Sequence, residues 1–205
     1  LGWYGPWDER PARINDATAA ALRAIELDDK EPAAHMALGR ALVLSGAAER
    51  GQAHLRRAVE LDPSFAQGHF ALSQALVFLG RLDEALQEVE EAFRLSPRDP
   101  HLWTFFNIRG VARYRAGDLR GSEADQRAAL DQQNVTFWPA MFLVANLARQ
   151  GRIADGEAAI AELHRFRPDF SLADARREFF FCERSYVPPD FIDELLADLA
   201  LAGLT

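Results

Sequence analysis

The sequence has one cysteine, Cys182, among its 205 residues. An internal disulfide is therefore excluded, and the low cysteine content is consistent with a reducing compartment. Long hydrophobic runs are also missing, because the longest, Phe137–Ala145, is far shorter than the roughly 20 residues that cross a bilayer. The sequence does not open on a basic segment followed by an apolar one, which is the secretory pattern. We expect a cytoplasmic protein without membrane contact.

An excess of positive charge is absent as well. The formal net charge is -8, which opposes long-range attraction to phosphates, so we expect no nucleic-acid partner. Motifs of catalysis are missing too: there is no Gly-rich phosphate loop, no nucleophile elbow and no His-Glu-x-x-His element. Cys182 follows three phenylalanines, a setting that disfavours a reactive thiolate. We expect no catalytic residues, no metal site and no cofactor, and hence no enzyme activity in this region.

A repeat of 34 residues is the most informative feature that is present. Gly46 and Gly80 are separated by this step, as are Gly117 and Gly151. The step is typical of tetratricopeptide repeats, in which each copy is one antiparallel pair of helices. The sequence therefore predicts an all-α, right-handed superhelix (an α-solenoid) of stacked helix hairpins with a helical cap at the C-terminal end.

The apolar pattern divides this predicted single domain, residues 1–205, into copies. Pro63 and Pro97 end the second helices of the first two full copies. Ser171 is placed to cap a short helix through about Arg177, and a last helix is expected over Phe191–Leu201. The predicted segments are a partial N-terminal hairpin at 1–30, with its second helix at 14–27, repeats at 32–65, 66–99, 100–136 and 137–170, and capping helices within 171–205.

The third copy departs from the pattern. Gly80 and Gly117 are 37 residues apart, and polar Arg109, Arg113 and Gln126 stand where the repeat has apolar contacts. We expect the first helix of this copy to begin earlier than in the others. It would then present Leu102, Phe105 and Phe106 to the core.

One segment carries a more specific resemblance. Arg94-Leu95-Ser96-Pro97-Arg98-Asp99-Pro100, followed by Leu102-Trp103, resembles a segment of bacterial tetratricopeptide-repeat regions that lie C-terminal to class III adenylate/guanylate cyclase domains or winged-helix transcriptional regulators. The tail, with Arg167-Pro168-Asp169-Phe170-Ser171, resembles the ending of the same group. The resemblance implies a regulatory or partner-binding appendage of a signalling protein, with an N-terminal catalytic or DNA-binding part.

The first helices of such hairpins line a groove that can hold a helix or an extended peptide. Aromatic, Met and Arg side chains are typical of binding surfaces. The alternative is that Phe70, Phe78 and Met141 belong to the core between repeats. The expected partner is a protein, a peptide or another domain of the same chain, and self-association is a further alternative. The groove candidates are Met36, Arg40, Leu44, Phe70, Gln74, Phe78, Asn107, Tyr114, Met141 and Arg149.

Arg109 and Arg113 lie one turn apart, so they share a helix face. Two guanidinium groups can hold a carboxylate or phosphate, which gives the competing hypothesis of a small-anion sensor. The alternatives are an internal ion-pair network with Glu123, Asp125 or Glu88, or a different register of this copy.

Two histidines and an acidic stripe have structural interpretations. His35 and His69 occupy equivalent positions of neighbouring hairpins, and we expect packed side chains rather than metal ligands. Glu84, Glu88 and Glu91 are expected on a solvent-facing stripe.

Overall fold

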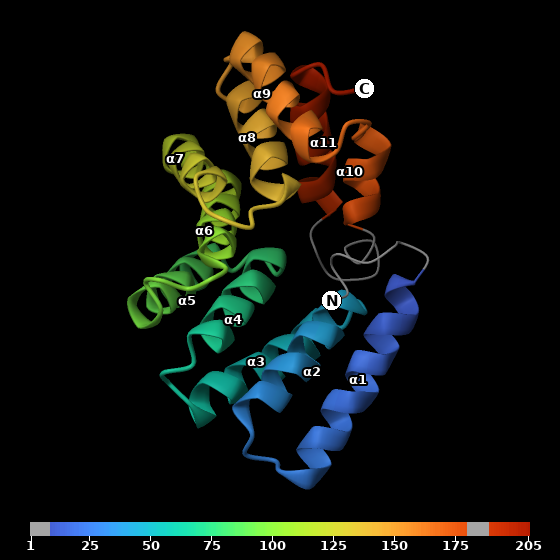
Figure 1. Cartoon of the computed structure of the whole chain (residues 1–205), viewed down its shortest axis with the longest axis vertical. Coiled ribbons are helices and arrows are strands. Elements are labelled where there is room, and N and C mark those ends of the chain that lie inside the picture. The colour runs from blue at the N-terminus through green and yellow to red at the C-terminus, as the bar shows by residue number, and fades with distance from the viewer. Residues whose placement is uncertain (1–8, 180–188) are drawn as a thin grey trace. The chain divides into compact units, whose positions relative to one another are not determined.

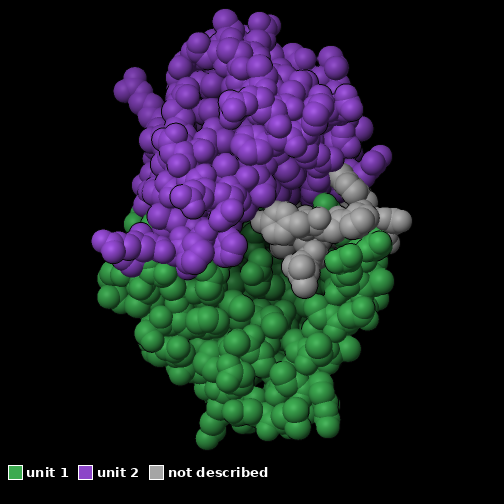
Figure 2. Space-filling model, in the orientation of Figure 1, with its two compact units in different colours: residues 1–96, 181–187 green, residues 97–180, 188–205 purple. Residues whose placement is uncertain are grey.

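The computed structural model describes residues 9–179 and 189–205, which form eleven α-helices in two compact units (Figures 1 and 2). Unit 1 contains the described residues 9–96, and unit 2 contains 97–179 and 189–205. Residues 1–8 of the predicted N-terminal hairpin and Cys182 lie outside the described residues. Within these ranges, none of the helices combines the length and the apolar character that crossing a membrane requires.

Unit 1 is built from one single helix and two helix hairpins. The helix α1 packs against the first hairpin, α2 with α3, and α3 packs against α4, which pairs with α5 in the second hairpin. The first helices of the two hairpins, α2 and α4, also touch each other. The five helices are α1 (Arg10–Leu27), α2 (Pro32–Leu44), α3 (Ala48–Leu61), α4 (Ala66–Phe78) and α5 (Leu82–Leu95).

Glycine fixes both the turns and the closest helix contact of unit 1. Gly46 and Gly80 adopt φ values of 89° and 75°, the left-handed region that favours glycine at the turn of each hairpin. Between α2 and α3, a Cβ on Gly39 would lie 2.6 Å from Cγ of Leu55 and 2.8 Å from the carbonyl oxygen of Gly51. The two helices can approach this closely only because both crossing positions lack a side chain.

Unit 2 contains two more hairpins and two terminal helices. The hairpins are α6 (Leu102–Ala116) with α7 (Leu119–Leu130), and α8 (Phe137–Arg149) with α9 (Ile153–Phe166). They are followed by α10 (Leu172–Glu178) and α11 (Pro189–Leu201), and α11 packs against α8. Gly117 and Gly151 supply the turns, with φ values of 83° and 76°.

The terminal helices follow the capping signals of the sequence. Ser171 accepts a hydrogen bond from the backbone N–H of Asp174, and the Asp174 carboxylate accepts one from the N–H of Ser171. This reciprocal arrangement satisfies two donors at the start of α10. Gly203 follows α11 with φ at 95°, as expected for a residue just beyond a helix end.

The all-α arrangement of antiparallel hairpins is confirmed for the described residues. Helix α6 begins at Leu102 and buries Phe105 completely, whereas Leu102 and Phe106 stay half-buried. Helix α1 begins at Arg10 rather than Ile14, because Pro11 fits the first turn of a helix, where its missing N–H costs nothing. The repeat boundaries remain predictions, and each predicted repeat contains one complete hairpin.

Candidate functional site

The first helices of the four hairpins carry no acidic residue. Helix α4 has no Arg, Lys, Asp or Glu at all, and the others carry only arginines. These are Arg40 on α2, three arginines on α6 and Arg149 on α8. We call the surface made by α2 and α4 the first-helix face of unit 1, and that made by α6 and α8 the first-helix face of unit 2. Both faces therefore carry positive charge and no acidic side chain, in a chain whose net charge is -8.

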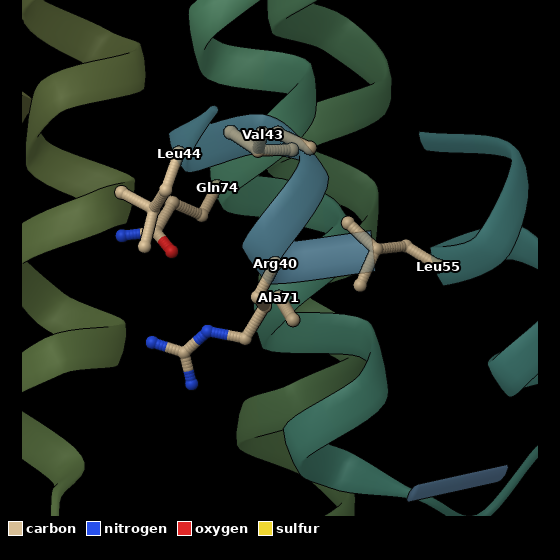
Figure 3. A pocket seen from close by; sticks show the side chains of 7 residues that line it. Arg40, Val43, Leu44, Leu55, Ala71 and Gln74 are labelled. Carbon is tan, nitrogen blue, oxygen red and sulfur yellow. The ribbon is translucent and has the colours of Figure 1, made fainter. Parts of the chain in front are cut away.

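A narrow pocket, with essentially no room for a water molecule, lies between α2, α3 and α4 in unit 1 (Figure 3). Its wall is apolar and well buried, and its polar members, Arg40 and Gln74, are half-buried. In Figure 3 the guanidinium of Arg40 and the amide of Gln74 extend toward the same side of the two helices. The lining residues are Arg40, Val43, Leu44, Leu55, Ala71, Gln74 and Ala75.

The structure thus brings three of the predicted groove residues, Arg40, Leu44 and Gln74, together at one pocket. Met36 is half-buried on the same helix as Arg40. Leu44, Phe70 and Phe78 are all buried, with exposed fractions of 8%, 5% and 5%. Both aromatic side chains are part of the core, which is the alternative interpretation that the sequence left open for them.

On unit 2 the first-helix face is covered by α11 of the same chain. Nε of Arg149 donates to Oδ2 of Asp198 at 2.5 Å, and Nη2 donates to Glu194 at 3.0 Å. The hydroxyl of Tyr114 on α6 also donates to Asp198. The Arg149 guanidinium lies 4.2 Å from the centre of the Tyr114 ring, a cation–π contact. Burial, followed by the hydrogen bond to Asp198, raises the pKa of Tyr114, so the phenol stays protonated.

Apolar contacts hold the other end of α11 on this face. The Phe191 ring stacks on Phe142 of α8 with centroids 6.5 Å apart, and the Arg115 guanidinium lies 4.6 Å from the Phe191 centroid. Tyr114 and Met141 have no exposed surface. As predicted groove residues they are corrected: a completely buried side chain cannot contact a separate partner, and both belong to the core. Asn107 is half-buried, and its carbonyl accepts a hydrogen bond from Gln126.

Arg109 and Arg113 bind a carboxylate of their own unit. Nη2 of Arg109 lies 2.7 Å from Oδ1 of Asp125, and Nη1 of Arg113 lies 2.8 Å from Oδ2. The Asp125 residue is only 3% exposed. The internal network is therefore confirmed, with Asp125 as the partner. An added anion would have to compete with Asp125, so no observation favours an anion sensor at these arginines.

The first two hairpins each hold a pair of polar side chains at equivalent positions. Nδ1 of His35 lies 3.1 Å from Nδ1 of His54, and Nδ1 of His69 lies 2.6 Å from Oε2 of Glu88; both pairs are 19 residues apart. The hydrogen bond to Glu88 raises the pKa of His69, whereas burial, with the nearby His35 and Arg50, lowers the pKa of His54.

The remaining ring nitrogens of these histidines meet backbone carbonyls. Nε2 of His35 faces the carbonyl of Asp29, and Nε2 of His69 faces that of Pro63. The expectation of packed histidines is confirmed.

The glutamates of the predicted acidic stripe form ion pairs in addition to contacting solvent. Glu84 pairs with Arg56 and Arg81, and Glu91 pairs with Arg94. Over 9–179 and 189–205, no three His, Cys, Asp or Glu side chains are grouped to hold a metal ion.

A family model described as tetratricopeptide repeat matches residues 42–105. The matched segment runs from the end of α2 through α3, α4 and α5 to the first turn of α6. The fold is that of tetratricopeptide-repeat proteins. No curated protein matches the sequence significantly.

Solved tetratricopeptide-repeat (TPR) structures agree over most of the chain. A thermophilic TPR protein of Thermus thermophilus has a TM-score of 0.68 and 22% identity over 84% of this chain and 91% of its own. PilW, a type IV pilus biogenesis factor, has a TM-score of 0.74 and 17% identity over 95% and 83%. YrrB, a TPR protein with an unusual peptide-binding site, has a TM-score of 0.58 and 17% identity over 89% and 95%. At these sequence identities, the structural similarity establishes the TPR fold alone.

Two contacts on the first-helix face of unit 2 were not predicted from the sequence. Glu194 and Asp198, which bind Arg149, had been assigned only to the capping segment. One signal was available: they lie four residues apart on a helix that has four acidic residues and no basic one. Such a one-sided charge pattern indicates contact with a basic surface.

Proposed function

We propose that this region is a non-catalytic protein-interaction module, and that a helix or peptide of its partner binds at the first-helix face of unit 1. The observation that carries the proposal is the pocket at which Arg40, Leu44 and Gln74 meet. Its two polar members, Arg40 and Gln74, are half-buried at the surface of α2 and α4 and can orient a bound segment by hydrogen bonds. The peptide-binding site of YrrB, which has the same fold, supports this use of a TPR surface.

The partner is a separate protein or another domain of the same polypeptide. The resemblance of Arg94–Pro100 and of the tail to C-terminal regions of bacterial cyclases and regulators supports a regulatory role in a cytoplasmic signalling protein. In such a protein the upstream part performs the catalysis or the DNA binding, and the TPR region recognises what controls it.

Peptide selection with the purified full chain tests the proposal. A display library of random peptides is enriched on the wild type, and single binders are then measured against Arg40→Ala and Gln74→Ala. Both side chains are half-buried, so their truncation should leave the fold intact. The matched control is Arg57→Ala, which removes an arginine from an exposed position on α3.

We expect peptides that bind the wild type and Arg57→Ala equally and bind the two pocket variants at least tenfold more weakly. Equal affinity for all four proteins would place the binding surface elsewhere and contradict the proposal. Circular dichroism of each variant ensures that lost binding reflects the pocket rather than unfolding.

A further inference from the structure

We infer that the first-helix face of unit 2 is a second binding site, which takes an acidic amphipathic helix of a partner protein in place of α11. In the free chain, α11 closes this site as a resident competitor. The inference is independent of the proposed function, which concerns unit 1, and it gives α11 a regulatory role in addition to capping the last hairpin.

The first step is the surface on which α11 lies. Its side chains contact Tyr114 on α6 and both Phe142 and Arg149 on α8, the first helices of the two hairpins. Arg149 stands two positions before the turn glycine of its hairpin, as the predicted groove residue Leu44 does in the first hairpin. Because first helices line the groove in which a partner's helix can bind, α11 occupies the place of a bound helix.

The second step is the chemistry of α11, which is that of a helix held in a groove. Phe191, Leu195 and Leu199 recur every four residues and are 4%, 0% and 0% exposed, so they form one buried stripe. Two carboxylates beside this stripe, Glu194 and Asp198, bind the guanidinium on α8. The helix contains no Lys or Arg, so it is acidic as well as amphipathic.

The third step is that α11 can leave without breaking the hairpins. It packs against α8 and α10, whereas α6 pairs with α7 and α8 pairs with α9. In a repeat stack each hairpin is held by its neighbours, so removal of a flanking helix leaves the other pairings in place. The opposite side of α11 faces solvent, with Asp190, Asp193, Ala197 and Leu201 exposed. An element covered on one side only belongs to those that open at a lower free energy than global unfolding.

The fourth step is what the uncovered face requires of a new occupant. While α11 is in place, Tyr114 is completely buried and out of reach of a partner. Departure of α11 removes the acceptor shared by Tyr114 and Arg149, and the Phe142 ring loses its stacking contact with Phe191. An occupant must offer an apolar side chain and, seven residues or two helical turns away, a carboxylate, which is the spacing of Phe191 and Asp198. This requirement selects an acidic amphipathic helix.

Competition between α11 and a partner has a measurable consequence. The apparent dissociation constant of the partner equals its intrinsic value divided by the fraction of molecules in which α11 has left the face. A change that loosens α11 and leaves the face intact should therefore tighten binding. If α11 were only a cap, the same change would lower stability and produce no binding.

The test uses a fluorescein-labelled peptide of residues 189–205, which is titrated with the full chain and read by fluorescence anisotropy. Asp198→Asn in the chain removes the charge that holds α11 on Arg149 and leaves the face itself unchanged. Its matched control is Asp193→Asn, which removes a carboxylate of the same helix that pairs with Arg176 at the surface. Arg149→Glu, added to Asp198→Asn, reverses the charge of the face. Circular dichroism checks that each variant is folded.

We expect the peptide to bind Asp198→Asn at least tenfold more tightly than it binds the wild type or Asp193→Asn, and to lose this gain when Arg149→Glu is added. Equal affinity for the wild type and Asp198→Asn would overturn the inference, as would the absence of binding to every variant or a gain that survives Arg149→Glu. If Asp198→Asn does not fold, Glu194→Gln replaces it, because it weakens only the exposed contact of Arg149. A gain of at least twofold is then expected, and no gain would overturn the inference.

The oligomeric state distinguishes a partner protein from a second copy of the chain as the occupant. Analytical ultracentrifugation of the wild type should show a monomer at micromolar concentration. A dimer that dissociates when the peptide is added would mean that α11 is exchanged between two copies, and it would overturn the assignment to a partner protein.

Discussion

Asp198 on α11 and Arg149 on α8 form a charge-assisted hydrogen bond of 2.5 Å, 49 residues apart in the sequence. The pair joins the C-terminal helix to the first helix of the last hairpin and lies against the ring of Tyr114. Because both partners are largely shielded from water, the attraction is screened less than that of a surface pair. In unit 2, an acidic helix on a basic TPR face is therefore a structural fact of this chain.

Removing Asp198 should release this end of α11. Asp198→Ala is expected to lower the free energy of unfolding by about 2–3 kcal/mol, because Arg149 and Tyr114 both lose their acceptor. Glu194→Ala should cost less than about 1 kcal/mol, since the Glu194 side chain is 58% exposed. Urea unfolding followed by circular dichroism measures both. Equal losses for the two variants would contradict the assigned roles.

Asp125 should be more costly to remove. Asp125→Ala leaves the guanidinium groups of Arg109 and Arg113 without their shared carboxylate, and we expect a loss of about 3–5 kcal/mol. The double variant Asp125→Leu with Arg109→Leu should regain part of this loss, because an apolar pair needs no charge compensation. Thermal unfolding of the single and double variants measures this difference in stability. A double variant no more stable than Asp125→Ala alone would argue against the network.

The hairpins could be predicted because their determinants are local. The positive-φ turns at Gly46 and Gly117 and the capping box at Ser171 depend on residues close in sequence. Asp125 could be named as a partner of Arg109 because it lies on the second helix of the same hairpin. The 34-residue step then relates the second hairpin to the first and the fourth to the third, whereas 37 residues separate Gly80 from Gly117.

The covering of unit 2 by α11 could not be predicted in the same way. The apolar stripe of α11 shows that one face is buried, but it does not specify which surface covers it. Arg149 and Asp198 are brought together only by the tertiary fold. For the same reason Met141 was equally compatible with a groove and with the core, since an apolar side chain on a first helix serves either.

We expect the two histidine pairs to give opposite pH dependences of the stability of the protein. The pKa of His69 is raised, so its contribution to stability is complete below its ordinary pKa of 6.5 and is lost as the pH rises through the raised value. The stability difference between wild type and His69→Gln should therefore shrink as the pH increases above 6.5. Urea unfolding at a series of pH values measures this difference. A difference that grew with pH would contradict the assigned hydrogen bond to Glu88.

For His54 the sign is reversed. Its pKa is lowered, so its contribution is complete above its ordinary pKa of 6.5 and is lost as the pH falls through the lowered value. We expect the stability difference between wild type and His54→Gln to shrink below pH 6.5. The same urea series provides the measurement. A difference independent of pH would contradict the lowered pKa of His54, which arises from its burial and then from the nearby His35 and Arg50.

The crossing of α2 and α3 should tolerate no added methyl group. In Gly39→Ala the new Cβ would lie 2.6 Å from Cγ of Leu55 and 2.8 Å from the Gly51 carbonyl oxygen, so the helices must move apart. We expect a loss of about 1–3 kcal/mol despite the better helix propensity of alanine. Ala37→Ser, at an exposed position of the same helix, is the control and should cost less than about 1 kcal/mol. A stabilised Gly39→Ala protein in thermal unfolding would refute the close packing.

The first-helix face of unit 1 as the binding surface is tested most directly by NMR mapping. Isotope-labelled full chain is titrated with a peptide that was enriched on the wild type by display selection, and backbone amide shifts are followed for the described residues. We predict perturbations concentrated at the pocket, on Arg40, Leu44, Ala71, Gln74 and Ala75, and their loss in Arg40→Glu. Perturbations confined to α3 and α5, or to the α8 and α11 contact of unit 2, would contradict the account.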